Sequence, residues 1–430
     1  MRPARPAPVP ARSVRGERSI AVLDVGTSKV AALIAIVGGD GAPRVIGVGQ
    51  RACAGLRRGL VADMAQTEAA IRAAMGQAER NAGVQAGEVV VNLSAGGLAS
   101  HVETVEINVD GARIAQDDMD RLTKAGRDAI DPGTRTVLHA APALYTIDGL
   151  TGVSTPLGLH AARLGMDVHI VTADTPPARN LDLVVRSSEL GLRVIVASPV
   201  AASLACLAAE ERELGVALVE IGAGVTNIAV HFQGQLVGVA TIVMGAGDIT
   251  NDIAAAFATK RVHAERLKVL HGAAIASPKD SHEGLEIPPI SDDDTAEPQR
   301  IPAAQLIGVI RQRLDLLFGE VAKALTALGY TGPQARLVVL TGGGAELRAV
   351  ADFAQGSLGR SVRLGRPRGL TALPEAQAGC AFATLGGLAL FAAADKPDLY
   401  LAGRGGARLA ATNLSTTKFR QMLARLRNSI

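Results

Sequence analysis

Two short turns in the sequence combine acidic, hydroxyl and glycine residues in a pattern that could hold a phosphate group. The first contains Asp24, Gly26, Thr27 and Lys29, and the second contains Glu220, Gly222, Gly224 and Thr226. Because glycine has no side chain, backbone N–H groups at such turns can approach a bound anion closely. In each turn the acidic residue stands two positions before the first glycine. The shared pattern predicts two phosphate-binding turns of the same kind.

A third turn ends in three glycines. Residues 337–344 read LVVLTGGG, with Gly342, Gly343 and Gly344 at the end of an apolar strand, and the segment AELRAVADFA that follows is expected to be a helix. In such an arrangement a helix N-terminus can receive a nucleotide phosphate or sugar. A single glycine-containing turn is more often a turn and nothing more. Three such turns in this order favour a nucleotide site.

Three-stranded meanders must position the first two turns. The first meander reads SIAVLDVG, TSKVAALIAIV and RVIGVGQ, and the second reads VALVEIG, VTNIAVHF and QLVGVATI. This duplication predicts two related lobes that face one another across a cleft. Each meander is followed at a distance by a small-residue helix, PVAASLACLAAEE from Pro199 and GCAFATLGGLALF from Gly379. Their Ala and Gly content permits close approach, so we expect two packed core helices.

The length and composition predict a multi-lobed α/β protein. A chain of 430 residues, of which 48% are hydrophobic and 48 are glycines, is too long for one core and suggests two to four domains or lobes. Cys53, Cys206 and Cys380 have no metal-ligand spacing and cannot all pair, which indicates a reducing cytosol. The eight histidines form no HxxxH or HExxH pair, which argues against a metal enzyme.

Positive charge is concentrated at the two ends of the chain. Residues 1–18 carry five Arg and one Glu, residues 401–430 carry six Lys or Arg and no acid, and the body between them has a net charge of −7. Such a body is a poor match for nucleic acid, so we expect no nucleic-acid partner.

The Pro-, Ala- and Arg-rich residues 1–18 are expected to be a disordered basic tail without the apolar core of a signal peptide. No run reaches the roughly 18 apolar residues of a membrane span, so we expect a chain that does not cross a membrane.

Residues 88–164 read as a separate α+β unit between the two meanders. The expected strands are EVVVNLS, HVETVEINV and TVLHAAPALYTI, and the expected helix is AQDDMDRLTKAGRDAI. A unit of roughly 80 residues is within the usual range for a domain. It contains no phosphate-binding turn, which favours an interaction module. Further along, the Pro-rich acidic residues 277–300 are expected to form a surface loop, followed by an amphipathic helix from Pro302 to about Leu328.

Four segments carry a resemblance to a known family. They are LDVGTSKVAAL from Leu23, ERELGVALVEIGAGVTNIAV from Glu211, GAGDITNDIAAAFATKRVHAERLK from Gly245 and LTGGGAELRAV from Leu340. On these segments the sequence resembles the actin and DnaK-type ATPase superfamily and, within it, the FtsA family of bacterial cell-division proteins. The resemblance extends from Ser19 to about Leu399 and over the last fourteen residues. The segment from Gly245 is the most specific.

The resemblance implies an α/β, actin-like two-lobed fold of duplicated ribonuclease-H-like lobes, with an inserted α+β subdomain in the first lobe. The expected parts are a basic tail (1–18), a first-lobe core (19–86, continued by 166–200 and 380–398), the inserted subdomain (87–165), a second-lobe core (201–244, continued by 330–379), an outer subdomain of the second lobe (245–329), a linker (399–416) and a terminal helix (417–430).

The resemblance also implies how ATP and Mg²⁺ would be bound. The two hairpins would clasp the phosphates, with Asp24 holding Mg²⁺ through water and the hydroxyls and amides of residues such as Thr27 and Ser28 contacting phosphate. The water-mediated role suits one carboxylate, because Mg²⁺ keeps most of its waters. Lys29 either contacts phosphate or is solvated at a strand edge. Residues 342–344 would meet the nucleoside.

Glu265 and Lys268 admit two interpretations. They stand three positions apart on one helical face, and a surface ion pair at this spacing contributes only a few tenths of a kcal/mol. In the superfamily this helix flanks the adenosine, so the resemblance implies a nucleotide-binding role.

Several positions depart from the pattern of the superfamily. Most relatives have Asp where this chain has Glu220, and Gly and Thr where it has Ala223 and Val225. In hydrolytic relatives a carboxylate often precedes the proline of the hinge helix and positions the attacking water, but here that residue is Ser198. A serine cannot act as a carboxylate base, and positioning of water is a large part of phosphoryl-transfer catalysis. We therefore predict that ATP is bound, that hydrolysis is slow or absent, and that no residue can be assigned as catalytic.

The last fourteen residues form an amphipathic pattern. Residues 417–430 are expected to be a helix with one apolar face and one basic face. The apolar residues are Phe419, Met422, Leu423, Leu426 and Ile430, and the basic residues are Lys418, Arg420, Arg425 and Arg427. This helix either docks on the protein's own core or, as we favour, binds an anionic phospholipid membrane from one side. Each basic residue adds roughly 1 kcal/mol near an anionic leaflet, so a single copy binds weakly and filaments bind firmly by avidity.

The function implied by the resemblance is that of a cell-division adaptor. Such a protein would polymerise at the cytoplasmic side of the inner membrane, at the division septum, and would anchor FtsZ filaments of the Z ring. FtsZ would contact residues 245–329, and later divisome membrane proteins would contact residues 87–165, which also serve self-assembly. The alternatives are a PilM-type pilus-assembly adaptor, a DnaK-like ATPase, for which only thirty residues remain after residue 400, and a sugar or acetate kinase, for which no catalytic base is found.

Overall fold

The structure is a computed structural model that describes residues 17–39, 42–153, 155–290, 298–394 and 399. The predictions made for residues 1–16, for the linker after residue 399 and for the terminal helix 417–430, including all of its apolar and basic residues, lie outside the described residues.

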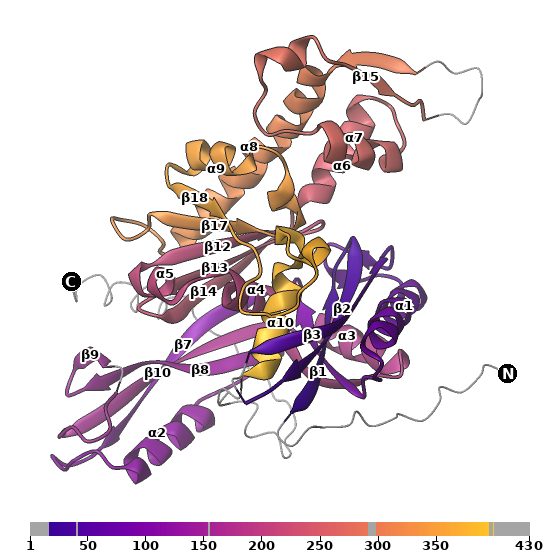
Figure 1. Cartoon of the computed structure of the whole chain (residues 1–430). Helices are drawn as coiled ribbons and strands as arrows, with labels where there is room; N and C mark the ends of the chain where they lie inside the picture. The colour runs from indigo at the N-terminus through magenta and orange to yellow at the C-terminus, as the bar shows by residue number, and fades with distance from the viewer. Residues whose placement is uncertain (1–16, 40–41, 154, 291–297, 395–398, 400–430) are drawn as a thin grey trace.

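The first lobe is built on a five-stranded sheet in the order β11-β6-β1-β2-β3 (Figure 1). Its strands are β1 (Arg18–Val25), β2 (Lys29–Val37), β3 (Pro43–Ala52), β6 (Glu88–Leu93) and β11 (Gly191–Ala197). The first three form the predicted antiparallel meander, and β6 and β11 add to it in parallel. Alternate apolar residues of β1 pack on opposite faces, against α1 (Met64–Ala82) and α3 (Thr175–Ser187) on one side and α10 (Ala383–Ala393) on the other.

The second lobe repeats this topology. Its sheet has the order β14-β13-β12-β17-β18. The strands are β12 (Val216–Ile221), β13 (Thr226–Phe232), β14 (Gln235–Ile242), β17 (Leu337–Thr341) and β18 (Ser361–Leu364). Again an antiparallel meander is followed by two parallel strands. The identical strand order confirms the predicted duplication.

Two helices cross between the lobes, as the small-residue pattern predicts (Figure 1). They are α4 (Ser198–Cys206) and α10. A Cβ atom built on Gly387 of α10 would lie 1.7 Å from the carbonyl oxygen of Ala201 in α4. Only glycine permits this approach, so the two helix backbones are in direct contact at the junction of the lobes.

The inserted unit has a four-stranded sheet in the order β7-β10-β8-β9, covered by one helix. Its elements are β7 (Ala99–Asn108), α2 (Gln116–Asp128), β8 (Arg135–Ile147), β9 (Leu150–Val153) and β10 (Arg163–Asp174). The backbone N–H of Asp174 donates to the carbonyl oxygen of Gly96 at 2.7 Å. The two ends of the insertion therefore meet.

The prediction for the strand EVVVNLS was wrong. We expected it to open the inserted unit, but it is β6 and lies between β1 and β11 in the first-lobe sheet. The first strand of the inserted sheet is β7, and β10, part of which was expected in the first lobe, lies at its centre. The physical reason is that Val89 and Val90 are buried on opposite faces of β6, against different core clusters. A strand buried on both faces needs a layered sheet around it.

The outer subdomain of the second lobe stands above its sheet (Figure 1). It contains α6 (Ala246–Ala256), α7 (Arg261–His271), β15 (Gly284–Ile287), β16 (Gln299–Pro302) and α8 (Ala303–Ala327). The helix predicted from Pro302 is confirmed as α8, whose buried stripe includes Leu314, Phe318 and Val321. The segment 277–300 was expected to be a loop, but β15 lies within it and pairs antiparallel with β16, which begins at Gln299.

The remaining elements of the described residues are short. They are β4 (Leu56–Arg57), β5 (Leu60–Val61), α5 (Ala209–Leu214), α9 (Val350–Leu358) and four 3₁₀ turns at Pro278–Ser281, Gly343–Glu346, Glu375–Gln377 and Cys380–Phe382. Leu399, expected to begin a linker, is buried in the inserted unit, where its N–H donates to the carbonyl oxygen of Ala140 at 2.9 Å.

Within the described ranges, no helix combines the length and apolar content needed to cross a membrane.

Candidate nucleotide-binding site

The first turn is a tight connection between β1 and β2. The N–H of Gly26 donates to the carbonyl oxygen of Lys29 at 3.0 Å, which places Asp24 at the end of β1. The side chain of Asn92 in β6 binds both Asp24 and its neighbour Val25. Its Nδ2 donates to Asp24 Oδ1 at 2.7 Å, and its Oδ1 accepts from the N–H of Val25 at 2.7 Å. Sequence reasoning missed Asn92, because a single Asn at the end of an apolar strand carries no recognisable spacing.

The second turn has the same geometry. The N–H of Gly222 donates to the carbonyl oxygen of Val225 at 2.9 Å. Glu220 accepts hydrogen bonds from the hydroxyl of Thr384 on α10 and, at 3.3 Å, from Nδ2 of Asn227. Thr384 and Asn227 were also missed, because both lie in otherwise apolar segments.

Both acids have raised pKa values, and Asp24 contributes to the rise at Glu220. Burial raises the pKa of Asp24 to about 6, against the attraction of Lys29 and the hydrogen bond from Asn92. Burial raises the pKa of Glu220 to about 7, and the charge of Asp24 adds to this rise. Burial destabilises the ionised form of both carboxylates. A divalent cation bound nearby would stabilise that form through its positive charge. The residues present therefore suit Mg²⁺ and a polyphosphate.

Lys29 is not solvated at a strand edge. Its Nζ lies 3.4 Å from the centroid of the Phe382 ring, which precedes α10. Burial lowers the pKa of Lys29, while the nearby charges of Asp24 and Glu346 oppose that change. The ammonium group therefore lies between acids of both lobes.

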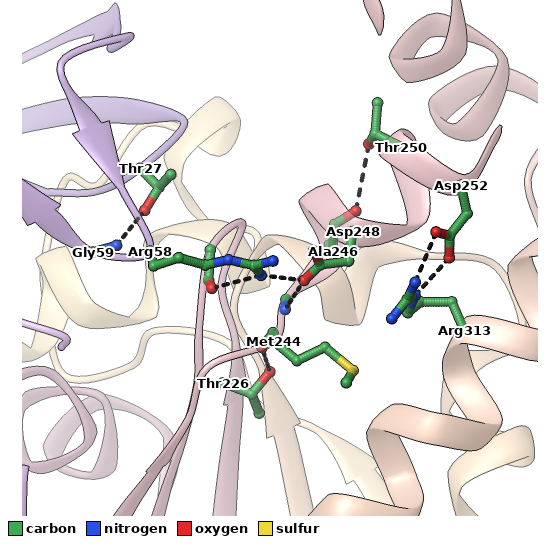
Figure 2. Close-up of polar contacts among 12 residues, drawn as sticks. Thr27, Arg58, Gly59, Thr226, Met244, Ala246, Asp248, Thr250, Asp252 and Arg313 are labelled. Atoms are coloured by element: carbon green, nitrogen blue, oxygen red, sulfur yellow. Dashed lines mark hydrogen bonds and ion pairs between the residues drawn. The ribbon is translucent and has the colours of Figure 1, made fainter. Parts of the chain in front are cut away.

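The two turns touch one another. A Cβ atom built on Gly224 would lie 2.7 Å from Thr27 Oγ1, so a side chain at this position would push the turns apart. Thr27 Oγ1 accepts from the N–H of Gly59 at 2.9 Å (Figure 2). The hydroxyl of Thr226 donates to the carbonyl oxygen of Met244 at 2.9 Å and supports the second turn from behind. The sequence predicted one site containing Thr27, Gly224 and Thr226, and the structure brings these three residues together.

The three glycines pack against the end of β12. Gly342 has φ +82°, a conformation that favours glycine, and its Cβ would lie 2.5 Å from the carbonyl oxygen of Ile221. The expectation of a helix directly after the glycines was wrong. A 3₁₀ turn, Gly343–Glu346, comes first, and α9 begins only at Val350, after Ala349 in the left-handed conformation.

Glu265 and Lys268 join α7 to α6. Lys268 Nζ donates to Glu265 Oε2 at 2.8 Å, to Thr250 Oγ1 at 2.8 Å and to the carbonyl oxygen of Ala246 at 3.1 Å. The Lys268 side chain is only 11% exposed, so the pair is more than a solvated surface contact. A role toward adenosine stays a prediction.

Ser198 contacts the side-chain amide of Asn92. Its hydroxyl is buried and accepts a hydrogen bond from Asn92 Nδ2 at 3.0 Å. The same Asn92 group also binds Asp24. Ser198 thus helps to hold Asp24 in place through Asn92.

A cavity of about 1090 Å³ lies away from both turns. It is bounded by β8, β10, α3 and the end of α10, and its lining includes His169 and His231 but none of the turn residues. Ala393 and Ala394 also line it, so the chain passes from the cavity wall into residues outside the described part. Its lining is mixed, with Arg179, Arg186 and Arg193 beside the apolar residues.

Comparison with known families gives two matches. The family model described as "Cell division protein FtsA" matches residues 217–387, and the model described as "SHS2 domain inserted in FTSA" matches residues 95–172. The second range agrees with the inserted sheet from β7 to β10.

Curated relatives match over most of the chain. The cell division protein FtsA of Rhizobium meliloti (strain 1021) is 34% identical, over 90% of this chain and 90% of that protein. Those of Agrobacterium fabrum (strain C58) and Escherichia coli (strain K12) are 32% and 31% identical, over 91% and 82% of this chain and 92% and 85% of the relative.

Solved structures share the fold at low identity. The PilM–PilN type IV pilus biogenesis complex aligns with a TM-score of 0.60 and 19% identity, over 87% of this chain and 98% of the other. MreB5 of Spiroplasma citri bound to ADP aligns with a TM-score of 0.53 and 14% identity, over 87% and 96%. With the matched insertion, these likenesses confirm the actin-like two-lobed α/β fold.

Proposed function

This chain belongs to the FtsA family of cell division proteins, and we propose that it is an ATP-binding adaptor that polymerises at the inner face of the cytoplasmic membrane and anchors FtsZ filaments there. Nucleotide acts as a conformational ligand that favours one arrangement of the lobes.

The arrangement of Asp24 and Glu220 carries the proposal for nucleotide. These acids end equivalent strands of two duplicated lobes, beside two tight turns that touch each other. When bound, Mg²⁺ supplies the positive charge that two neighbouring carboxylates and a polyphosphate need. Asp24, oriented by Asn92, would hold the ion through water, and the backbone N–H groups of the turns would contact the phosphates.

The serine at position 198 supports the proposal that ATP hydrolysis is slow or absent. The position before Pro199 has a hydroxyl that is buried and already bonded to Asn92. A water molecule near the terminal phosphate then lacks a carboxylate base at this position. ATP is therefore sensed more than it is consumed.

Attachment to the membrane depends on the terminal segment 417–430. Its apolar and basic residues fit the surface of an anionic bilayer, and filaments multiply this weak contact. The outer subdomain, residues 245–329, contacts FtsZ, and the inserted unit serves self-assembly and contact with later division proteins.

Co-sedimentation with liposomes tests the proposal as a whole. We expect the full chain to bring FtsZ down with anionic liposomes, more strongly with MgATP than without nucleotide. Leu423→Glu should abolish pelleting, because it places a charge on the apolar face. Gln421→Glu adds the same charge outside that face and serves as the matched control.

Two outcomes would contradict the proposal. Unchanged liposome binding by Leu423→Glu would show that the terminal segment is not the anchor. Failure to pellet FtsZ, with capture of a pilus-assembly peptide instead, would favour the PilM-type alternative. Binding of a fluorescent ATP analogue that is lost in Asp24→Asn checks the nucleotide part separately.

A further inference from the structure

Arg58 joins the two lobes where the two turns meet. It lies in the two-residue turn between β4 and β5, where Arg58 and Gly59 both have positive φ, at 51° and 75°. This is the backbone of a tight hairpin. Arg58 Nη1 donates to Asp248 Oδ2 at 2.5 Å and to the carbonyl oxygen of Gly224 at 3.4 Å (Figure 2). One side chain of the first lobe thus contacts the second turn and the start of α6.

The hairpin that carries Arg58 is fixed against the first turn as well. The N–H of Gly59 donates to Thr27 Oγ1 at 2.9 Å. A Cβ atom on Gly224 would lie 3.0 Å from Arg58 Cα and 2.7 Å from Thr27 Oγ1. The guanidinium group therefore emerges beside both turns to which we assign the phosphates.

The two members of this ion pair are held differently. The Arg58 side chain is 44% exposed, whereas that of Asp248 is 8% exposed. Asp248 Oδ2 also accepts from the N–H of Gly245 at 2.9 Å, so it keeps a partner if Arg58 leaves. Because Arg58 is almost half exposed, water screens the pair and reduces what it contributes to stability. Arg58 is thus free to exchange one anionic partner for another.

A phosphate is a strong competitor for this guanidinium. Arginine binds phosphate oxygens through paired N–H donors, and a terminal phosphate carries more negative charge than a carboxylate. Asp248 offers Arg58 a contact through one oxygen that is shared with Gly245.

We propose that Arg58 senses the terminal phosphate of a nucleoside triphosphate: this phosphate takes the guanidinium from Asp248, whereas a nucleoside diphosphate leaves the Arg58–Asp248 pair intact. The inference rests on the proposed function, because it needs nucleotide between the two turns.

Loss of the Arg58–Asp248 pair would affect the outer subdomain through α6. Asp252, one helical turn further along α6, binds Arg313 of α8 through two contacts of 2.5 and 2.7 Å (Figure 2). Because α6 and α8 are joined by this ion pair, loss of the contact from Arg58 removes one restraint on both helices. The triphosphate thereby changes a restraint on the surface that we assign to FtsZ.

Opposite effects of two substitutions test the proposal. Binding of MgATP and MgADP to the full chain is measured by fluorescence of labelled nucleotides and by displacement. Arg58→Gln should weaken MgATP binding roughly tenfold, since it removes a charged hydrogen bond, and leave MgADP within about twofold. Asp248→Asn, which can still accept from Gly245, should strengthen MgATP binding about threefold, because it weakens the competitor for Arg58.

The control is Arg57→Gln, which removes the same charge from the neighbouring residue and should leave both affinities within about twofold. Arg58→Lys keeps the charge but not the paired donors, and it should lose part of the preference for MgATP. Unfolding midpoints of all variants establish that they fold. If Arg58→Gln does not fold, Arg58→Lys decides.

An ion pair that only holds the lobes together would behave differently. Both substitutions would then change binding in the same direction, and would do so for MgATP and MgADP alike. That result would overturn the inference. If the wild-type chain binds neither nucleotide, the proposed function itself fails, which is a distinct outcome.

Discussion

Asp24 and Glu220 are the residues whose charge the fold controls most directly. Burial raises their pKa values to about 6 and about 7, above the ordinary values of 3.8 and 4.5. Between the ordinary and the raised pKa values, these two carboxyl groups therefore bind protons more tightly in the folded chain than in the unfolded chain. The stability that these protons contribute is fully present below the ordinary pKa and is lost as the pH rises through the raised pKa.

Glu220→Gln should remove much of this pH dependence. In the absence of Mg²⁺ and nucleotide, we expect the wild-type chain to lose on the order of 2 kcal/mol of unfolding free energy relative to Glu220→Gln between about pH 5 and pH 8. Urea unfolding at each pH measures the difference. Glu213→Gln, at an exposed position on α5, controls for the loss of a carboxylate. Parallel pH profiles of wild type and Glu220→Gln would contradict the assignment.

At the scale of elements, the crossing of α4 and α10 decides how the lobes are joined. The backbone contact between Gly387 and Ala201 places Thr384 of α10 against Glu220 of the second lobe. The neighbouring Leu385 and Leu388 pack under the first-lobe sheet. One helix therefore contacts the cores of both lobes, and its position sets the distance between the two turns.

Gly387→Ala should separate the two helices. A new methyl group cannot fit 1.7 Å from the Ala201 oxygen, so we expect a loss of about 1 to 3 kcal/mol of unfolding free energy and weaker nucleotide binding. Gly319→Ala in α8 is the matched control, since a Cβ there meets nothing within 4 Å. It should be neutral or stabilise by up to about 1 kcal/mol. Equal unfolding free energies for the two variants would show that the crossing tolerates a side chain.

At the scale of the whole molecule, the chain enters and leaves the inserted unit at one place in the first lobe, and the unit also packs on the second lobe through Val102. Its ends meet at the hydrogen bond between Asp174 and Gly96. Leu98, Leu138 and Val171 pack into the first-lobe core, which orients the unit beside the two lobes. The unit can therefore be removed without breaking the order of strands in either lobe.

Replacement of residues 97–173 by a short Gly–Ser linker tests this independence. We expect a chain that still binds labelled MgATP but no longer forms filaments in sedimentation. It should be less stable, because apolar surfaces of both lobes become exposed. The same linker inserted at the turn of Asp110 and Gly111, which leaves the unit whole, is the control. Filaments formed by the excised chain would contradict the proposed role in self-assembly, and lost nucleotide binding would contradict the independence of the lobes.

The sequence by itself determined the features that depend on local pattern. The paired meanders, the close-packed helices and the long helix α8 follow from apolar spacing, small residues and turns, which neighbouring residues set together. The placement of both acids at equivalent turns follows from the duplication.

Only the tertiary structure decided which distant segments meet. The apolar sequence of strand 88–93 is compatible with either sheet and does not specify which strands it pairs with. Its partners β1 and β11 are determined by the two core clusters that cover its opposite faces. Asn92 beside Asp24, Thr384 beside Glu220 and Arg58 beside Asp248 join residues 68, 164 and 190 positions apart. Such pairs leave no periodic signal, because the contact depends on how whole lobes pack and not on the spacing of residues along either segment.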